Sequence, residues 1–297
     1  MNLQNILTEI ESTDPEVYER LDTRRNAMQR FAFAGKVLAA AAIPFAFGSM
    51  FKKAYGQSNS QIVDVLNFAL TLEYLEAEFY KQAATSPAAS GASAGDKAAL
   101  ALIRDHEVAH VSFLRTAITS LGGSPVTLTA ANFDFTGGSG SGNGPFASVF
   151  SNYSVLLAVA QTFEDTGVRA YKGQADKLMG NKDVLTAALR IHSVEARHAA
   201  KLRHMRRMQP AATSLIPAGV TLQPWITLAQ SGIATGNTGA DAAIQKTYAG
   251  EEVVTQANVG ITNINGQQIA ATEASEAFDE PLTREQVLDI VKPFIKP

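Results

Sequence analysis

The chain has 297 residues, of which 46% are hydrophobic, and a formal net charge of −3. This length permits one large domain or a domain with appendages, and the hydrophobic share is sufficient for a sizeable core. The small net charge argues against a nucleic acid or another polyanion as the partner. The chain contains no cysteine, which excludes disulfides, zinc ribbons and iron–sulfur clusters.

Residues 1–56 combine an amphipathic start with a basic pair and an apolar run. Residues 1–22 are helically patterned and acidic, Arg24 and Arg25 form the pair, and an Ala-rich run extends from Phe31 to Phe51. This layout resembles a twin-arginine export signal, which implies cleavage and export to the periplasm or cell envelope.

Two features of this segment depart from the export pattern. Ala27 stands where a bulky apolar residue is usual, and 23 residues precede the arginine pair. Two alternatives therefore stand beside the signal. Residues 31–51 are long enough to cross a bilayer, so an uncleaved segment would anchor the protein in a membrane. The third interpretation is a buried helix.

Apolar periodicity predicts four long helices in the middle of the chain. Gly-rich and Ser-rich loops, or a Gly-Asn pair, separate them. The predicted helices span residues 60–84, 96–121, 146–179 and 181–208. The connection at 122–145 is unusually long for a compact domain.

The last part of the chain, residues 210–297, is poor in charge and rich in Thr, Gly, Asn and Gln. Asn265-Gly266 predicts a small hairpin within this mostly irregular extension. Thr283 and Gln286 fit a capping box, which predicts a helix at the C-terminus.

The second and fourth predicted helices each carry a Glu-x-x-His motif: Glu107 with His110, and Glu195 with His198. Residues three apart share one face of a helix, so each motif presents a carboxylate beside an imidazole, as in half of a metal site. With 16 Glu and five His in the chain, random order gives fewer than one such motif.

The first and third predicted helices each carry a glutamate followed by a tyrosine seven residues later. These pairs are Glu73 with Tyr80 and Glu164 with Tyr171. Two helical turns separate the members of each pair, so they share a face. Glu73 lies within an apolar stripe, where an unsatisfied carboxylate is costly. The chain therefore contains the same pattern twice: a lone glutamate on one predicted helix, followed by a Glu-x-x-His motif on the next.

These motifs resemble those of the ferritin-like superfamily of di-metal carboxylate proteins, which includes bacterioferritin, rubrerythrin and manganese catalase. The runs LNFALTLEYLEAEFY and EAFDEPLTREQVLDIVKPFI are similar to the bacterial ferritin-like or desiccation-related proteins. The resemblance implies an all-α, antiparallel four-helix bundle over residues 57–209 with a long second connection. It also implies two Fe or Mn ions held by Glu73, Glu107, His110, Glu164, Glu195 and His198, with Glu107 and Glu195 bridging.

Several other residues are candidates for contact with the ligands. Tyr80 and Tyr171 are either core tyrosines or hydrogen-bond partners of the Glu-x-x-His residues, and His192 either contacts a ligand or packs. Glu76 is assigned to the surroundings of the site or to the surface, because its repeat equivalent is Gly167. His106 and His204 lack ligand spacing. The basic run from Arg197 to Arg207 is interpreted as a solvated helix end.

Three functions remain open at this stage. The first is a di-metal oxidase that uses dioxygen or peroxide, and the second is peroxide dismutation of the manganese catalase type. The third is a structural stress-protection protein whose metal site is a stabilising clip. Fold analogy alone does not decide among them.

Overall fold

The computed structural model describes residues 59–210 and 214–297. The predicted export signal or anchor lies outside these residues. None of the helices in the described part is both long and apolar enough to cross a membrane.

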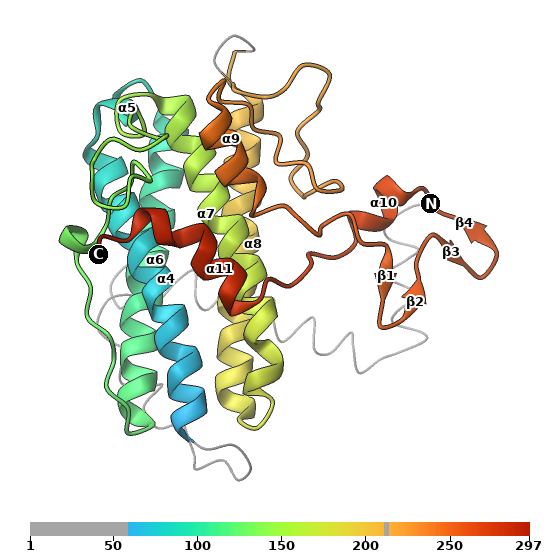
Figure 1. Ribbon diagram of the computed structural model, residues 1–297, viewed down its shortest axis with the longest axis horizontal. Helices are drawn as coiled ribbons and strands as arrows, with labels where there is room; N and C mark the ends of the chain where they lie inside the picture. Colours follow the sequence, from blue (N-terminus) through green and yellow to red (C-terminus); the bar gives the residue numbers. More distant parts are fainter. Residues whose placement is uncertain (1–58, 211–213) are drawn as a thin grey trace, which may run out of the picture. The chain divides into compact units, whose positions relative to one another are not determined.

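Four long helices form the centre of the molecule: α4 Asn59–Thr85, α6 Ala94–Ser120, α7 Tyr153–Gln174 and α8 Lys182–Arg207. Helix α4 packs antiparallel against α6, and α7 packs antiparallel against α8 (Figure 1). Each helix buries an apolar face against the others, which stabilises the bundle through the hydrophobic effect. The predicted four-helix bundle is confirmed.

The long connection between α6 and α7 runs along the bundle and returns the chain to the other end (Figure 1). Helices α6 and α7 therefore point in the same direction, as the repeated half-site requires. Asp134 orders the return loop by accepting backbone hydrogen bonds from Thr136, Gly140 and Gly142. A short 3₁₀ helix, η1 Ala130–Asn132, lies within the same connection.

Helix α7 is shorter than predicted. The sequence predicted a start at Phe146, but the helix begins at Tyr153 because the extended Asn152 caps it and accepts the amide hydrogens of Ser154 and Val155. Phe146 and Val149 are buried in the turns that precede the cap, so burial rather than helix gives this segment its apolar pattern. The tighter 3₁₀ turn η2 Ala175–Leu178 follows α7.

The boundaries of α4, α6 and α8 agree with the prediction to within two residues, whereas α7 ends at Gln174 and not at 179. The stretch between the first two predicted helices contains the short helix α5 Pro87–Ser90. Helix α6 ends before Gly122, which adopts φ 81° in the left-handed region that favours glycine. Asn181 caps α8 by accepting from the amide of Val184.

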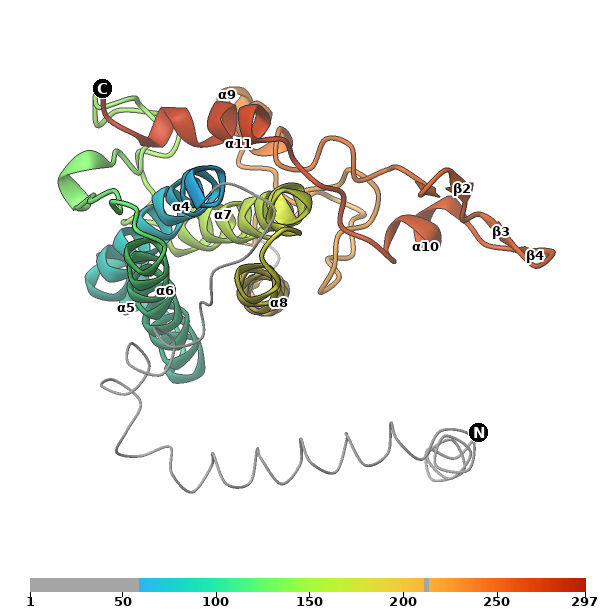
Figure 2. The same cartoon turned by 90° about the horizontal axis from the view of Figure 1, so that it is seen from below.

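The C-terminal extension forms further small elements that lie against and beside the bundle. Helix α9 Thr238–Gln245, helix α11 Arg284–Val291 and the 3₁₀ helix η3 Lys292–Phe294 lie on the side of α4 and α7, opposite α6 and α8 (Figure 2). The capping box of Thr283 and Gln286 begins α11, as predicted.

Two small hairpins and helix α10 Ala271–Ser275 stand beside the bundle (Figure 1). Their strands are β1 Thr255–Gln256, β2 Val259–Gly260, β3 Asn263–Ile264 and β4 Gln267–Gln268. The predicted Asn265-Gly266 turn joins β3 to β4, with φ values of 53° and 79°. The β1–β2 turn uses Ala257 at φ 50°, which the sequence does not signal because alanine rarely adopts that conformation.

Candidate metal centre

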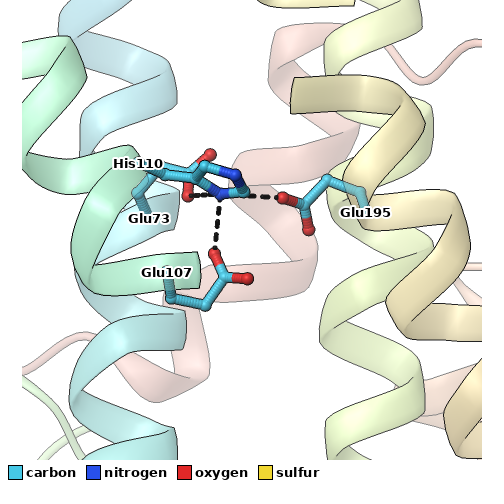
Figure 3. A group of neighbouring side chains, drawn as sticks. All are labelled: Glu73, Glu107, His110 and Glu195. Carbon is cyan, nitrogen blue, oxygen red and sulfur yellow. Dashed lines mark hydrogen bonds and ion pairs between the residues drawn. The ribbon is translucent and has the colours of Figure 1, made fainter. Parts of the chain in front are cut away.

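The structure brings the six predicted ligand residues together in the bundle core. One cluster contains Glu73, Glu107, His110 and Glu195 (Figure 3), and the other contains Glu107, Glu164, Glu195 and His198. Within each cluster the ligand atoms lie within 4.8 Å of one another. Glu107 and Glu195 belong to both clusters, which is the arrangement that two bridging carboxylates require.

One imidazole nitrogen lies at the centre of the first cluster (Figure 3). His110 Nδ1 is 3.0 Å from Glu73 Oε2, 3.1 Å from Glu107 Oε2 and 3.2 Å from Glu195 Oε1. A ring nitrogen carries at most one hydrogen, so it cannot donate to three oxygens at once. A cation among these atoms would accept all four as ligands.

The second cluster has a similar imbalance between donors and acceptors. His198 Nδ1 lies 2.9 Å from Glu107 Oε1 and 3.0 Å from Glu164 Oε2. Glu107 Oε1 and both carboxylate oxygens of Glu195 are buried and form no hydrogen bond within residues 59–210 and 214–297. Buried oxygens that accept no hydrogen bond are costly. These carboxylates and imidazoles therefore fit two divalent cations, whose charge would balance the four carboxylates.

Burial and mutual repulsion shift the pKa values of these groups away from their ordinary values. Burial is the main cause that raises the pKa of Glu73 to about 7, and burial with Glu107 and Glu164 raises the pKa of Glu195. Burial also acts to raise the pKa of Glu107, but the adjacent imidazoles of His110 and His198 outweigh it and lower that pKa to about 2. The metal-free cluster therefore retains protons that cations would displace.

The two tyrosines cross from one half of the site to the other. Tyr80 Oη on α4 donates to Glu164 Oε1 on α7 at 2.5 Å, and Tyr171 Oη on α7 donates to Glu73 Oε1 on α4. The sequence interpretation offered a Glu-x-x-His residue as the partner, and that partner is wrong. Because α4 and α7 run antiparallel side by side, a tyrosine two turns after one lone glutamate reaches the lone glutamate of the other helix.

Glu76 is buried beside the site. Glu76 is only 3% exposed, so the surface interpretation of this residue is wrong. A Cβ atom at Gly167 would lie 3.3 Å from both Glu76 Oε1 and Glu195 Oε2, so the glycine leaves room for Glu76 beside the site.

His192 Nδ1 lies 2.9 Å from the carbonyl oxygen of Val168 and joins α8 to the backbone of α7.

The basic end of α8 is only partly solvated, because Arg203 and Arg206 are buried. Arg203 Nη2 donates to Asp165 Oδ2 at 2.5 Å, and Arg206 Nη1 donates to Gln161 Oε1 at 2.5 Å. The C-terminal extension covers this face, and Arg206 Nη2 reaches the carbonyl of Gly232 at 2.6 Å. Sequence reasoning missed this network, although polar side chains four residues apart in the apolar third helix were a signal.

His106 contacts the site without belonging to either cluster. Its Nδ1 atom lies 2.9 Å from Nε2 of His198, and the two rings lie edge to edge, 18° from parallel with centroids 5.2 Å apart. Burial, followed by the neighbouring His198, lowers the pKa of His106, which favours the neutral form of its ring. This contact with His198 was not predicted from the sequence.

Comparison with known proteins gives one match that covers the bundle. A family model described as a ferritin-like domain matches residues 61–208. The chain carries a ferritin-like domain. The matched range includes all six clustered residues and extends from α4 through α8. No curated protein and no solved structure matches the chain.

Proposed function

We propose that the ferritin-like domain holds two Fe or Mn ions and uses them in redox chemistry with dioxygen or hydrogen peroxide, in protection against oxidative or desiccation stress. The observation that supports this function is the convergence of four buried carboxylates and two imidazoles around two adjoining positions. Carboxylate and imidazole donors without thiolate suit iron and manganese better than softer-ligand metals.

The residues divide into bridging and terminal ligands. Glu107 and Glu195 would bridge, Glu73 and His110 would complete one position, and Glu164 and His198 would complete the other. When bound, the two metal ions would supply changes of oxidation state that amino-acid side chains cannot. The carboxylate-rich donor set favours the higher oxidation state, and the surrounding apolar bundle excludes bulk water from the reacting atoms.

The tyrosines orient the terminal carboxylates. Each hydroxyl group of Tyr80 and Tyr171 occupies one oxygen of a lone glutamate, while the other oxygen of that glutamate faces a histidine. This arrangement fixes the rotation of both carboxylates before a metal arrives. Preorganised ligands reduce the reorganisation that binding and turnover require.

Metal content and turnover of the full protein test this proposal. Protein purified from its native host should contain two Fe or Mn ions per chain, measured by elemental analysis, and should consume dioxygen or peroxide. Glu195→Ala should lose both properties, whereas Glu273→Ala, at an exposed position on α10, should keep them. Peroxide dismutation with bound Mn would favour the manganese catalase type, and bound metal without turnover would favour the structural clip.

We propose further that the protein is exported through its twin-arginine-like N-terminus. The support is the layout of Arg24, Arg25 and the apolar run from Phe31 to Phe51. N-terminal sequencing of the mature protein should find a start near residue 57. A mature protein that begins at Met1 and fractionates with membranes would instead support the anchor.

A further inference from the structure

His198 is held at both of its ring nitrogens, and the second partner is another histidine. Its Nδ1 atom faces the carboxylates of Glu107 and Glu164, while its Nε2 atom lies 2.9 Å from Nδ1 of His106. The His106 and His198 rings lie 18° from parallel. His106 is on α6 and is only partly buried. Its contact with His198 therefore joins α6 to α8.

This geometry determines which ring nitrogen of His198 carries hydrogen. A hydrogen bond between two imidazole nitrogens needs one donor and one acceptor. Since Nδ1 of His198 faces the metal position, its lone pair is needed there, and Nε2–H must donate to Nδ1 of His106. The contact therefore holds His198 in the tautomer and ring orientation that a metal ligand requires.

The other half of the site lacks this support. The position that corresponds to His106 in the repeat is Val194, whose side chain can neither donate nor accept a hydrogen bond. Within the described part of the chain, the hydrogen bonds of His110 all involve Nδ1 and carboxylates. The two half-sites thus share their ligands but differ in how their histidines are oriented.

We propose that His106 is a positioning residue for His198, so that the metal position built on His198 binds its ion more tightly and fills before the position built on His110. This inference rests on the proposed function only in that two ions bind. Loss of the outer hydrogen-bond partner of a metal-ligating histidine typically costs about 10-fold to 100-fold in metal affinity. The same loss is expected here at one of the two positions.

Calorimetric titration of the metal-free full chain with Mn(II) tests this order of filling. Wild type should bind two ions in two resolved steps, and His106→Ala should weaken the tighter step by about 10-fold while the weaker step stays unchanged. His106→Gln, whose amide oxygen can accept from Nε2–H, should restore most of the affinity. Val194→Ala, the repeat-equivalent control, should leave both steps unchanged.

A second pair of measurements assigns the affected step to His198. His198→Ala should remove the tighter step, and adding His106→Ala to it should cause no further loss. In metal-free protein, the Nε2–H proton of His198 should give a downfield, slowly exchanging NMR signal that is absent in His106→Ala. This signal reports the hydrogen bond even if a variant binds metal poorly.

The outcomes separate this inference from the proposed function. A wild-type chain that binds neither Mn(II) nor Fe(II) would overturn both. Two-step binding in wild type that is unchanged in His106→Ala, or weakened equally at both steps, would overturn the role of His106 and leave the di-metal site standing. Survival of the NMR signal in His106→Ala would also contradict it.

Discussion

At the scale of single residues, the centre of this bundle is a concentration of charge that the fold alone does not compensate. Glu73, Glu107, Glu164 and Glu195 have no exposed surface. Removing a carboxylate from water costs several kcal/mol unless a cation, a proton or hydrogen bonds replace the solvent. Protons on the histidines and glutamates provide part of that compensation in metal-free protein, and metal ions would provide more. Metal binding should therefore be linked to folding.

Glu195→Gln tests this linkage at a bridging position. Because burial and neighbouring carboxylates raise the pKa of Glu195, a neutral amide of the same shape should leave the melting temperature of metal-free protein unchanged or higher. The rise in melting temperature that Mn(II) or Fe(II) gives to wild type should be mostly lost, since the amide is a poor bridging ligand. Differential scanning calorimetry with and without metal measures both effects. An equal metal-induced rise in the variant would contradict the bridging role.

Tyr80→Phe tests the crossed hydrogen bonds. Removing a donor to a buried carboxylate should cost about 1.5–3 kcal/mol of unfolding free energy in denaturant titrations. Two metal ions should still bind, because all six ligands remain, but turnover should slow since Glu164 loses its fixed orientation. Tyr171→Phe is the matched variant in the other half, with the same expected losses. A marked stability loss in one variant alone would show that the halves do not share this device.

At the scale of helices and loops, sequence patterns predicted what depends on local chemistry. The helices followed from apolar periodicity, and the breaks between them from Gly-rich and Ser-rich loops and a Gly-Asn pair. The six clustered residues were predicted because a repeated spacing on helices fixes which side chains share a face. The spacing of residues along one helix could not predict which side chains meet between helices. The pairing of Tyr80 with Glu164, and of His106 with His198, depends on how helices far apart in sequence are aligned.

The start of α7 shows how a local cap can override periodicity, and it can be tested directly. Asn152→Ala removes the side chain that accepts the amides of Ser154 and Val155 and should cost about 1 kcal/mol of unfolding free energy. Hydrogen exchange should quicken at those two amides, while metal binding two turns or more further along the helix remains. Ser151→Ala, on the adjacent exposed residue, is the control and should change little. Unaltered exchange at Ser154 would show that the cap does not hold the helix start.

At the scale of the whole described molecule, the C-terminal extension is part of the folded bundle. Arg169 on α7 is 1% exposed and its guanidinium binds carbonyl oxygens of Thr247, Ala249 and Glu280 in the extension. Arg169 Nε also lies 2.6 Å from Glu251 Oε1, another buried group. A Cβ atom at Gly173 would overlap the carbonyl oxygen of Leu282, so the extension approaches α7 as closely as glycine allows.

Arg169→Met should therefore destabilise the whole protein and not only its extension. Breaking a buried ion pair typically costs about 3–5 kcal/mol because the remaining charge is unpaired. Lys246→Met is the control, since the Lys246–Asp289 pair has the same 2.6 Å separation but side chains 49% and 64% exposed. An exposed pair contributes about 0–1 kcal/mol, so burial decides the difference. Equal effects of the two variants on urea unfolding would contradict the proposed anchoring of the extension.

The loss in Arg169→Met should also depend on pH. Burial raises the pKa of Glu251 to about 7, although Arg169 opposes the shift. A carboxyl group whose folded pKa exceeds its unfolded value of about 4.5 stabilises the fold most below pH 4.5, and this contribution is lost as pH rises through about 7. Without Arg169 that pKa rises further, so the variant should lose more stability relative to wild type at pH 8 than at pH 5. Adding Glu251→Gln to Arg169→Met removes the unpaired charge and should abolish most of this pH dependence. If the loss of unfolding free energy in Arg169→Met is instead the same from pH 5 to pH 8, lost packing and not charge destabilises the variant.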